Sequence, residues 1–181
     1  MTLRTKFTRA TLLAFFAAGC AFCPAGAQAA ARSPQDKDYL TSVEADKIRD
    51  AETTNDRIVL FINFADDRLK KFQYELDHPA QSRHAETLNY MMNSYIGCVD
   101  DASDLIQEGI EKQQNIRIGI DLMSSKAKEY LVTLKKISAD AREIEIYKLN
   151  LDDAIEGTQD AINDAEKAKK NVAPAPTRRK N

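Results

Sequence analysis

The stretch 88–111 constrains the fold more than any other part of this chain. Its apolar side chains recur at steps of three and four residues, which places them on one face of an α-helix: Leu88, Met92, Tyr95, Val99, Ala102, Ile106 and Ile110. Acidic side chains occupy another face: Asp101, Asp104, Glu108 and Glu111. A helix of this length with one apolar face needs other helices to cover that face. The sequence therefore predicts a domain built from several helices.

Three further long stretches have the same spacing, and each predicts a helix that packs along an apolar seam. In 56–76 the seam consists of Ile58, Ile62, Ala65, Leu69, Phe72 and Leu76. In 118–141 it consists of Ile120, Met123, Ala127, Tyr130, Leu134, Ile137 and Ala141. In the last helix it consists of Leu151, Ile155, Thr158, Ile162, Ala165 and Ala168, which include few large residues. We therefore expect this last helix to be the most peripheral and the least stable.

A short helix is predicted to precede these four. Thr41, followed by Glu44 three residues later, forms a capping-box pattern, and a helix from there to about Ala51 has too few apolar positions to stand alone. Because the connections between the long helices are short, consecutive helices are expected to be antiparallel neighbours. The predicted fold is all-α: an antiparallel four-helix bundle with an additional short N-terminal helix, spanning 39–170.

The expected helix ends rest on local signals. Thr54 or Asn55 is expected to cap the second helix, Pro79 to end it, and Ser82 to cap the third. Residues 143–151 alternate between polar and apolar, which is compatible with an edge strand. We favour a connection that packs on the end of the bundle, because a single strand has no partner here. Asn150 with Asp153 is then expected to cap the last helix.

The two ends of the chain have their own signatures. Residues 1–29 are predicted to be a signal peptide, with Arg4, Lys6 and Arg9 before an apolar run that is too short to favour a retained membrane anchor. Cleavage is expected after Ala29, with Ala27 as the alternative. A lipobox-like sequence ending at Cys20 leaves lipidation, and hence a membrane tether, as a second possibility. Residues 30–38 are predicted to be a flexible leader, and 171–181 a disordered, proline-containing tail.

Charge and cysteine content narrow the possible partners. The formal net charge is −2, and removal of the predicted signal peptide 1–29 would make it more negative, since the charged residues of that segment are all basic. Arg178, Arg179 and Lys180 lie in the tail, so the rest of the chain is acidic, which argues against a nucleic-acid-binding protein. The tail itself is a candidate for contact with an anionic surface or with acidic faces of another copy. Cys98 is the only cysteine expected to remain after cleavage, and we expect it to be buried rather than paired between chains.

The candidate metal ligands are weak. Glu75 and His78 match the Glu-x-x-His spacing of di-iron helical bundles, but the second copy that such a site requires is absent. Asp101, Asp104 and Glu108 could attract a divalent cation, although a helix spreads them along a line, and a solvated face is the favoured interpretation. We therefore predict neither a metal site nor a cofactor. No arrangement typical of nucleophilic catalysis is present, so the sequence predicts a protein that is not an enzyme.

Three segments in order carry a resemblance: Tyr39-Leu-Thr with Glu44-Ala-Asp, Tyr95-Ile-Gly-Cys-Val-Asp-Asp101, and Leu151-Asp-Asp-Ala-Ile-Glu-Gly-Thr158. They resemble a family of exported bacterial all-helical proteins of unknown activity. The resemblance implies export and an all-helical fold, and it implies no cofactor or site residues. The expected function is that of a non-enzymatic structural or protein-interaction module of the periplasm or cell envelope, binding an unknown protein or itself. The alternative is a helical bundle that binds a small ligand or a divalent cation.

Overall fold

The computed structural model describes residues 39–172, and within this range every regular element is an α-helix. The helices are α1 (Ser42–Asp50), α2 (Thr54–Asp77), α3 (His84–Glu111), α4 (Arg117–Asp140) and α5 (Ile144–Asn171). The all-α prediction and the helical bundle are confirmed for this part of the chain. The predicted signal peptide, leader and nearly all of the predicted tail, including Cys20, Arg178, Arg179 and Lys180, lie outside the described residues.

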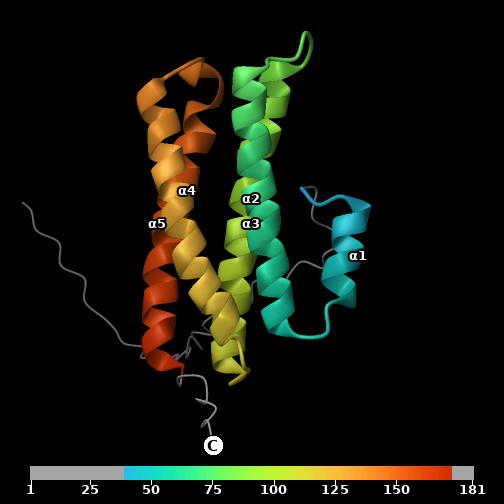
Figure 1. Ribbon diagram of the computed structural model, residues 1–181, viewed down its shortest axis with the longest axis vertical. Coiled ribbons are helices and arrows are strands. Elements are labelled where there is room, and N and C mark those ends of the chain that lie inside the picture. Colours follow the sequence, from blue (N-terminus) through green and yellow to red (C-terminus); the bar gives the residue numbers. More distant parts are fainter. Residues whose placement is uncertain (1–38, 173–181) are drawn as a thin grey trace, which may run out of the picture. The chain divides into compact units, whose positions relative to one another are not determined.

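The four long helices pack in a ring. Each of α2 and α5 lies against both α3 and α4, and α1 lies against α2 (Figure 1). Two aromatic pairs cross the centre of this ring. Phe72 of α2 meets Tyr147 of α5 edge to face at 5.0 Å between ring centroids, and Tyr95 of α3 meets Tyr130 of α4 in the same way at 5.7 Å. These four aromatic side chains fill the core between helices that face each other across the bundle.

The predicted seams form this core. Every seam residue predicted in 56–76 is buried, as are those predicted in 88–111 except Ile110, which is half-buried. In α4 the seam is buried as far as Ile137, but Ala141 is exposed. It ends the helix in a left-handed conformation with φ 51°, so its inclusion in the seam was wrong. Cys98 is fully buried, as expected.

Two glycines let helices or side chains approach closely. A Cβ atom on Gly119 of α4 would lie 2.8 Å from Cγ2 of Ile58 on α2. A Cβ atom on Gly97 of α3 would lie 2.7 Å from Cε1 of Tyr39, the residue that precedes α1 by three positions. Glycine at these positions is therefore explained by close packing.

The segment 143–151 is neither a strand nor a connection. It begins α5, which starts at Ile144 after Glu143. Tyr147 and Leu151 are buried at helical spacing, whereas Leu149 is 79% exposed, so the alternation of apolar residues does not reflect alternating burial. Asn150 is no helix cap, because it lies inside α5 and donates from Nδ2 to Oδ1 of Asn89 at 2.6 Å. The alternating pattern misled because Leu149 is apolar but faces solvent.

The position of α5 also differs from expectation. It packs against both α3 and α4, so it is not peripheral. Its small residues allow this close packing, because they are buried where larger side chains would hold neighbouring helices apart: Ala154, Ala161, Ala165 and Ala168. In this protein, a seam with few large residues therefore belongs to a helix that packs closely against its neighbours, and not to a peripheral helix.

Two further predicted caps were wrong. Helix α2 is capped by Thr53, whose Oγ1 accepts from the backbone N–H of Asp56 at 3.1 Å. Asn55, one of the two expected caps, instead accepts from the backbone N–H of Gly119 through Oδ1 at 2.8 Å. Helix α3 follows Arg83, which has φ 62° and no side-chain cap, rather than Ser82. The capping box of Thr41 and Glu44 is confirmed.

Candidate functional site

The Glu75–His78 pair is not brought together. Pro79 follows His78, which leaves helical geometry as the C-cap of α2 with φ −136°. The His78 ring stacks on Tyr74 at 4.4 Å between centroids, and it is exposed. Glu75 turns to other partners, since its Oε1 accepts from the backbone N–H of Ala80 at 2.9 Å and lies 2.6 Å from Nδ1 of His84.

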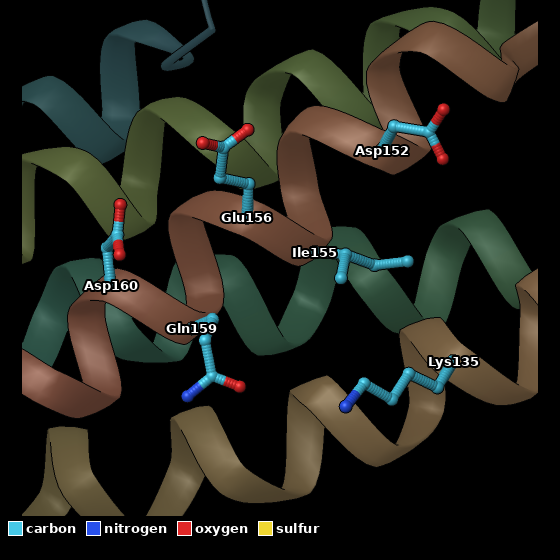
Figure 2. Close-up of a pocket in the computed structure, with 6 residues that line it drawn as sticks. All are labelled: Lys135, Asp152, Ile155, Glu156, Gln159 and Asp160. Atoms are coloured by element: carbon cyan, nitrogen blue, oxygen red, sulfur yellow. The ribbon is translucent and has the colours of Figure 1, made fainter.

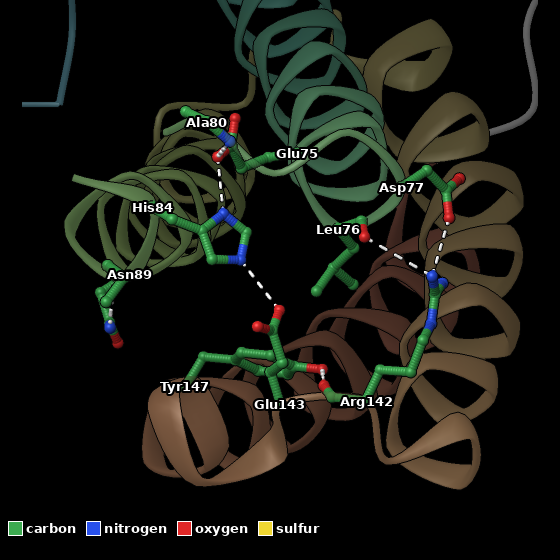
Figure 3. A network of polar contacts seen from close by, with 10 residues as sticks. Glu75, Leu76, Asp77, Ala80, His84, Asn89, Arg142, Glu143 and Tyr147 are labelled. Atoms are coloured by element: carbon green, nitrogen blue, oxygen red, sulfur yellow. Dashed lines mark hydrogen bonds and ion pairs between the residues drawn. The ribbon is translucent and has the colours of Figure 1, made fainter. Parts of the chain in front are cut away.

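His84 joins three segments at this end of the bundle (Figure 3). Nδ1 lies 2.6 Å from Oε1 of Glu75 on α2, and Nε2 lies 2.9 Å from Oε2 of Glu143, the residue that precedes α5. The hydrogen bonds to Glu75 and Glu143 raise the pKa of His84 above its ordinary value. The bond from His84, together with that from Ala80, lowers the pKa of Glu75.

A second contact set lies beside this histidine. Nη1 of Arg142, in the α4–α5 connection, lies 3.0 Å from Oδ1 of Asp77, and Nε donates to Asp140 at 2.7 Å. The hydroxyl of Tyr147 donates to the backbone carbonyl of Arg142 at 2.5 Å. A cleft of about 210 Å³ lies here, with an apolar wall and a charged rim, lined by Gln73, Leu76, Asp77, Lys136, Ile137, Asp140, Arg142 and Tyr147.

The acidic side chains of α3 have separate surroundings. Asp104 is exposed, Glu108 pairs with Lys112, and Asp101 is half-buried. Burial, and after it the charge of Asp104, raises the pKa of the neighbouring Asp100. Within residues 39–172 no three histidine, cysteine, aspartate or glutamate side chains are grouped so that they could hold a metal ion.

A buried charge network fastens α1 to the bundle. Arg68 of α2 is 3% exposed and donates to Oε2 of Glu44 at 2.6 Å and to Oδ2 of Asp67 at 2.6 Å. It also donates to the backbone carbonyl of Tyr39 at 3.3 Å. Burial raises the pKa of Glu44, but hydrogen bonds from Arg68 and Thr41 outweigh this, so the pKa lies below its ordinary value. We therefore assign this network a structural role, which is to hold α1 against α2.

A further cleft lies on the outside of the bundle, between α4 and α5. It has a volume of about 310 Å³ and is lined by Lys135, Asp152, Ile155, Glu156, Gln159 and Asp160 (Figure 2). In Figure 2, Gln159 points from α5 toward α4 and Lys135 lies along α4, whereas Glu156 and Asp160, which also line the cleft, point away from α4. The cleft therefore has a polar rim, with Ile155 as its apolar component.

Two exposed aliphatic residues each lie one helical turn from a residue that lines this cleft. Val132 is 70% exposed and lies one helical turn before Lys135 on α4. Leu149 is 79% exposed and lies one turn before Asp152 on α5. Residues three apart on a helix are surface neighbours, so both side chains belong to the same side of the molecule as the cleft. We call this surface the α4/α5 face, defined by the six cleft residues with Val132 and Leu149.

Neither the contacts of His84 nor the α4/α5 face was predicted from the sequence. Glu143 is remote from His84 in the chain, and no local motif links them. The one available signal was that Glu75 and His84 flank the Pro79 break, which brings the end of one helix close to the start of the next. For the α4/α5 face, the signal was that Val132 and Leu149 fall outside the apolar seams.

Comparison with known proteins found no match to a family model, to a curated protein or to a solved structure. None of the helices within residues 39–172 is both long enough and apolar enough to cross a membrane.

Proposed function

We propose that this chain is an exported, non-enzymatic helical-bundle protein of the bacterial periplasm or cell envelope, and that it acts by binding a protein partner or a second copy. The observation that carries the proposal is the α4/α5 face, where Val132 and Leu149 expose most of their side chains beside a cleft. Exposed aliphatic side chains with polar groups beside them match the composition of protein contact surfaces.

The charge of this face indicates the chemistry of the partner. Its carboxylates are Asp152, Glu156 and Asp160, and its ammonium group is Lys135. Asp152 is already paired with Lys148 at 2.6 Å. The remaining excess of carboxylate favours a partner surface that presents aliphatic side chains with basic groups beside them.

Within residues 39–172, the two histidines and the cysteine are engaged in structural contacts, which supports a non-enzymatic role. His78 stacks on Tyr74, His84 holds two carboxylates, and Cys98 is buried in the core. Export and the kinship with exported all-helical proteins are part of the proposal, supported by the sequence of 1–29 and by the three segments described above. We further propose that the ring of long helices is antiparallel, since residues 78–83, 112–116 and 141–143 form short connections.

The double variant Val132→Glu with Leu149→Glu is expected to abolish binding or self-association while the fold is retained. Both side chains are exposed, so the free energy of unfolding should change by no more than about 1 kcal/mol for the pair. Glutamate would remove the aliphatic contact, and burying its carboxylate against the aliphatic side chains of the partner costs free energy. Sedimentation velocity measures self-association, and co-purification from envelope extract measures partner binding.

Tyr90→Glu is the matched control. Tyr90 is also an exposed large side chain, but it lies on α3, outside the α4/α5 face. It should leave both measurements unchanged. If the double variant associates and co-purifies like the wild type, the α4/α5 face is not the contact surface.

A further inference from the structure

His84 occupies the point where the end of α2, the start of α3 and the α4–α5 connection meet. It is the first residue of α3, and its side chain is only 15% exposed. Glu75 approaches one ring nitrogen from α2, and Glu143 approaches the other from the connection. In Figure 3 the imidazole lies between these two carboxylates. The imidazole of His84 therefore links three segments of the chain.

The two contacts of the His84 imidazole require that the imidazole carry a positive charge. An ionised carboxylate can only accept hydrogen bonds, and a neutral imidazole has one N–H to donate. Both contacts can be hydrogen bonds together only when His84 carries a proton on each ring nitrogen. When His84 is neutral, one nitrogen lone pair faces a carboxylate oxygen, and that contact becomes repulsive.

The backbone at this end depends on such contacts. Arg83 has φ 62°, Ala141 has φ 51° and Glu143 has φ 49°. Residues other than glycine seldom adopt this left-handed region, and they keep it only where the surrounding structure holds them there. Ala141 and Glu143 lie in the connection that His84 binds, so loss of the Glu143 contact removes one of the interactions that hold it.

Other charged groups face the same end of the bundle. From α2 and its end they are Asp77 and His78, from the start of α3 Arg83 and Glu86, and from the end of α4 and the connection Asp140 and Arg142. Arg83 pairs with Glu86 at 2.7 Å, and Arg142 pairs with Asp140 and Asp77. His78 stacks on Tyr74. The two arginines are thus engaged elsewhere, and His84 supplies the positive charge between Glu75 and Glu143.

We propose that Glu75, His84 and Glu143 form a pH-sensitive clasp, which holds the α4–α5 connection to α2 and α3 when His84 is protonated and releases it when that proton is lost. This inference goes beyond the proposed function and does not depend on it. Release of the connection would also loosen the 210 Å³ cleft, whose apolar wall includes Leu76 and Tyr147.

The direction of the pH dependence follows from the two shifted groups. Because the pKa of His84 is raised from 6.5, its stabilising effect is complete below about pH 6.5 and is lost as the pH rises through the raised value. Because the pKa of Glu75 is lowered from 4.5, its contribution is complete above about pH 4.5 and is lost as the pH falls through the lowered value. The clasp is therefore closed in mildly acidic solution.

The test combines two measurements on the full chain. Proton NMR of the two histidines, assigned with His78→Gln, should give His84 a pKa above 6.5, and Glu143→Gln should move that pKa downward. Thermal unfolding at pH 5.5 and pH 8.5 should show a fall in Tm for the wild type and for His78→Gln. In His84→Gln this fall should largely disappear.

The pKa measurement on the wild type needs only His78→Gln, a change at an exposed residue, for its assignment, so it does not depend on whether His84→Gln or Glu143→Gln folds. A His84 pKa at or below 6.5 would overturn the proposal. So would a fall in Tm between pH 5.5 and pH 8.5 that is as large in His84→Gln as in the wild type.

Discussion

Replacement of Tyr95 by alanine is expected to lower the free energy of unfolding by about 3–5 kcal/mol, as for other large aromatic residues removed from a core. Tyr95 is almost fully buried, and its ring meets Tyr130 edge to face across the bundle. Its hydroxyl lies 2.7 Å from Oγ1 of Thr158, which itself donates to the backbone carbonyl of Ala154. Alanine would remove contacts with α4 and α5 together. Chemical denaturation monitored by circular dichroism measures the loss.

Tyr95→Phe separates ring packing from hydrogen bonding. Since Thr158 uses its own proton on Ala154, Tyr95 is the donor in the bond between the two hydroxyls. Phenylalanine keeps the ring and removes that bond, so the cost should be only about 1 kcal/mol. If alanine and phenylalanine destabilise the protein equally, the ring does not fill the core as described.

Arg68→Ala is expected to lower stability by about 3–5 kcal/mol and to release α1. Removing one partner of a buried ion pair leaves the other charge without compensation, and Glu44 would be that charge. The change would also remove the bond to the carbonyl of Tyr39, which precedes α1. Denaturation measures the free energy, and limited trypsin digestion at Lys47 and Arg49 reports whether α1 is released.

Arg49→Ala serves as the control for Arg68→Ala. Arg49 forms an ion pair with Asp46, but about half of each side chain is exposed. Exposed pairs contribute about 0–1 kcal/mol, so this variant should unfold almost like the wild type. Equal effects from Arg49→Ala and Arg68→Ala would mean that the buried network does not anchor α1.

The sequence predicted the buried faces of the long helices well, because the apolar residues that recur at helical spacing are the ones that become buried. The seam of α2 from Ile58 to Leu76 and the buried state of Cys98 followed from that spacing. The capping box at Thr41 was also predictable, since both of its partners lie within one turn.

Features set by contacts between distant segments were not predictable in this way. The start of α5 was missed because Leu149 is apolar but exposed, which gave 143–151 a false alternation. The third helix begins after Arg83 without a side-chain cap, and its first residue, His84, contacts Glu75 and Glu143, which are distant in the chain. The grouping of Glu75, His84 and Glu143 depends on how three helix ends meet, which helical periodicity does not specify.

Site-specific photo-crosslinking tests the interaction surface most directly. A photoreactive amino acid is placed at Leu149 on the α4/α5 face in one protein and at Tyr90 on α3 in another, and both are irradiated in the producing cells. The account predicts a discrete adduct of higher mass from position 149 and none from position 90. No adduct from position 149, or the same adducts from both positions, would contradict it.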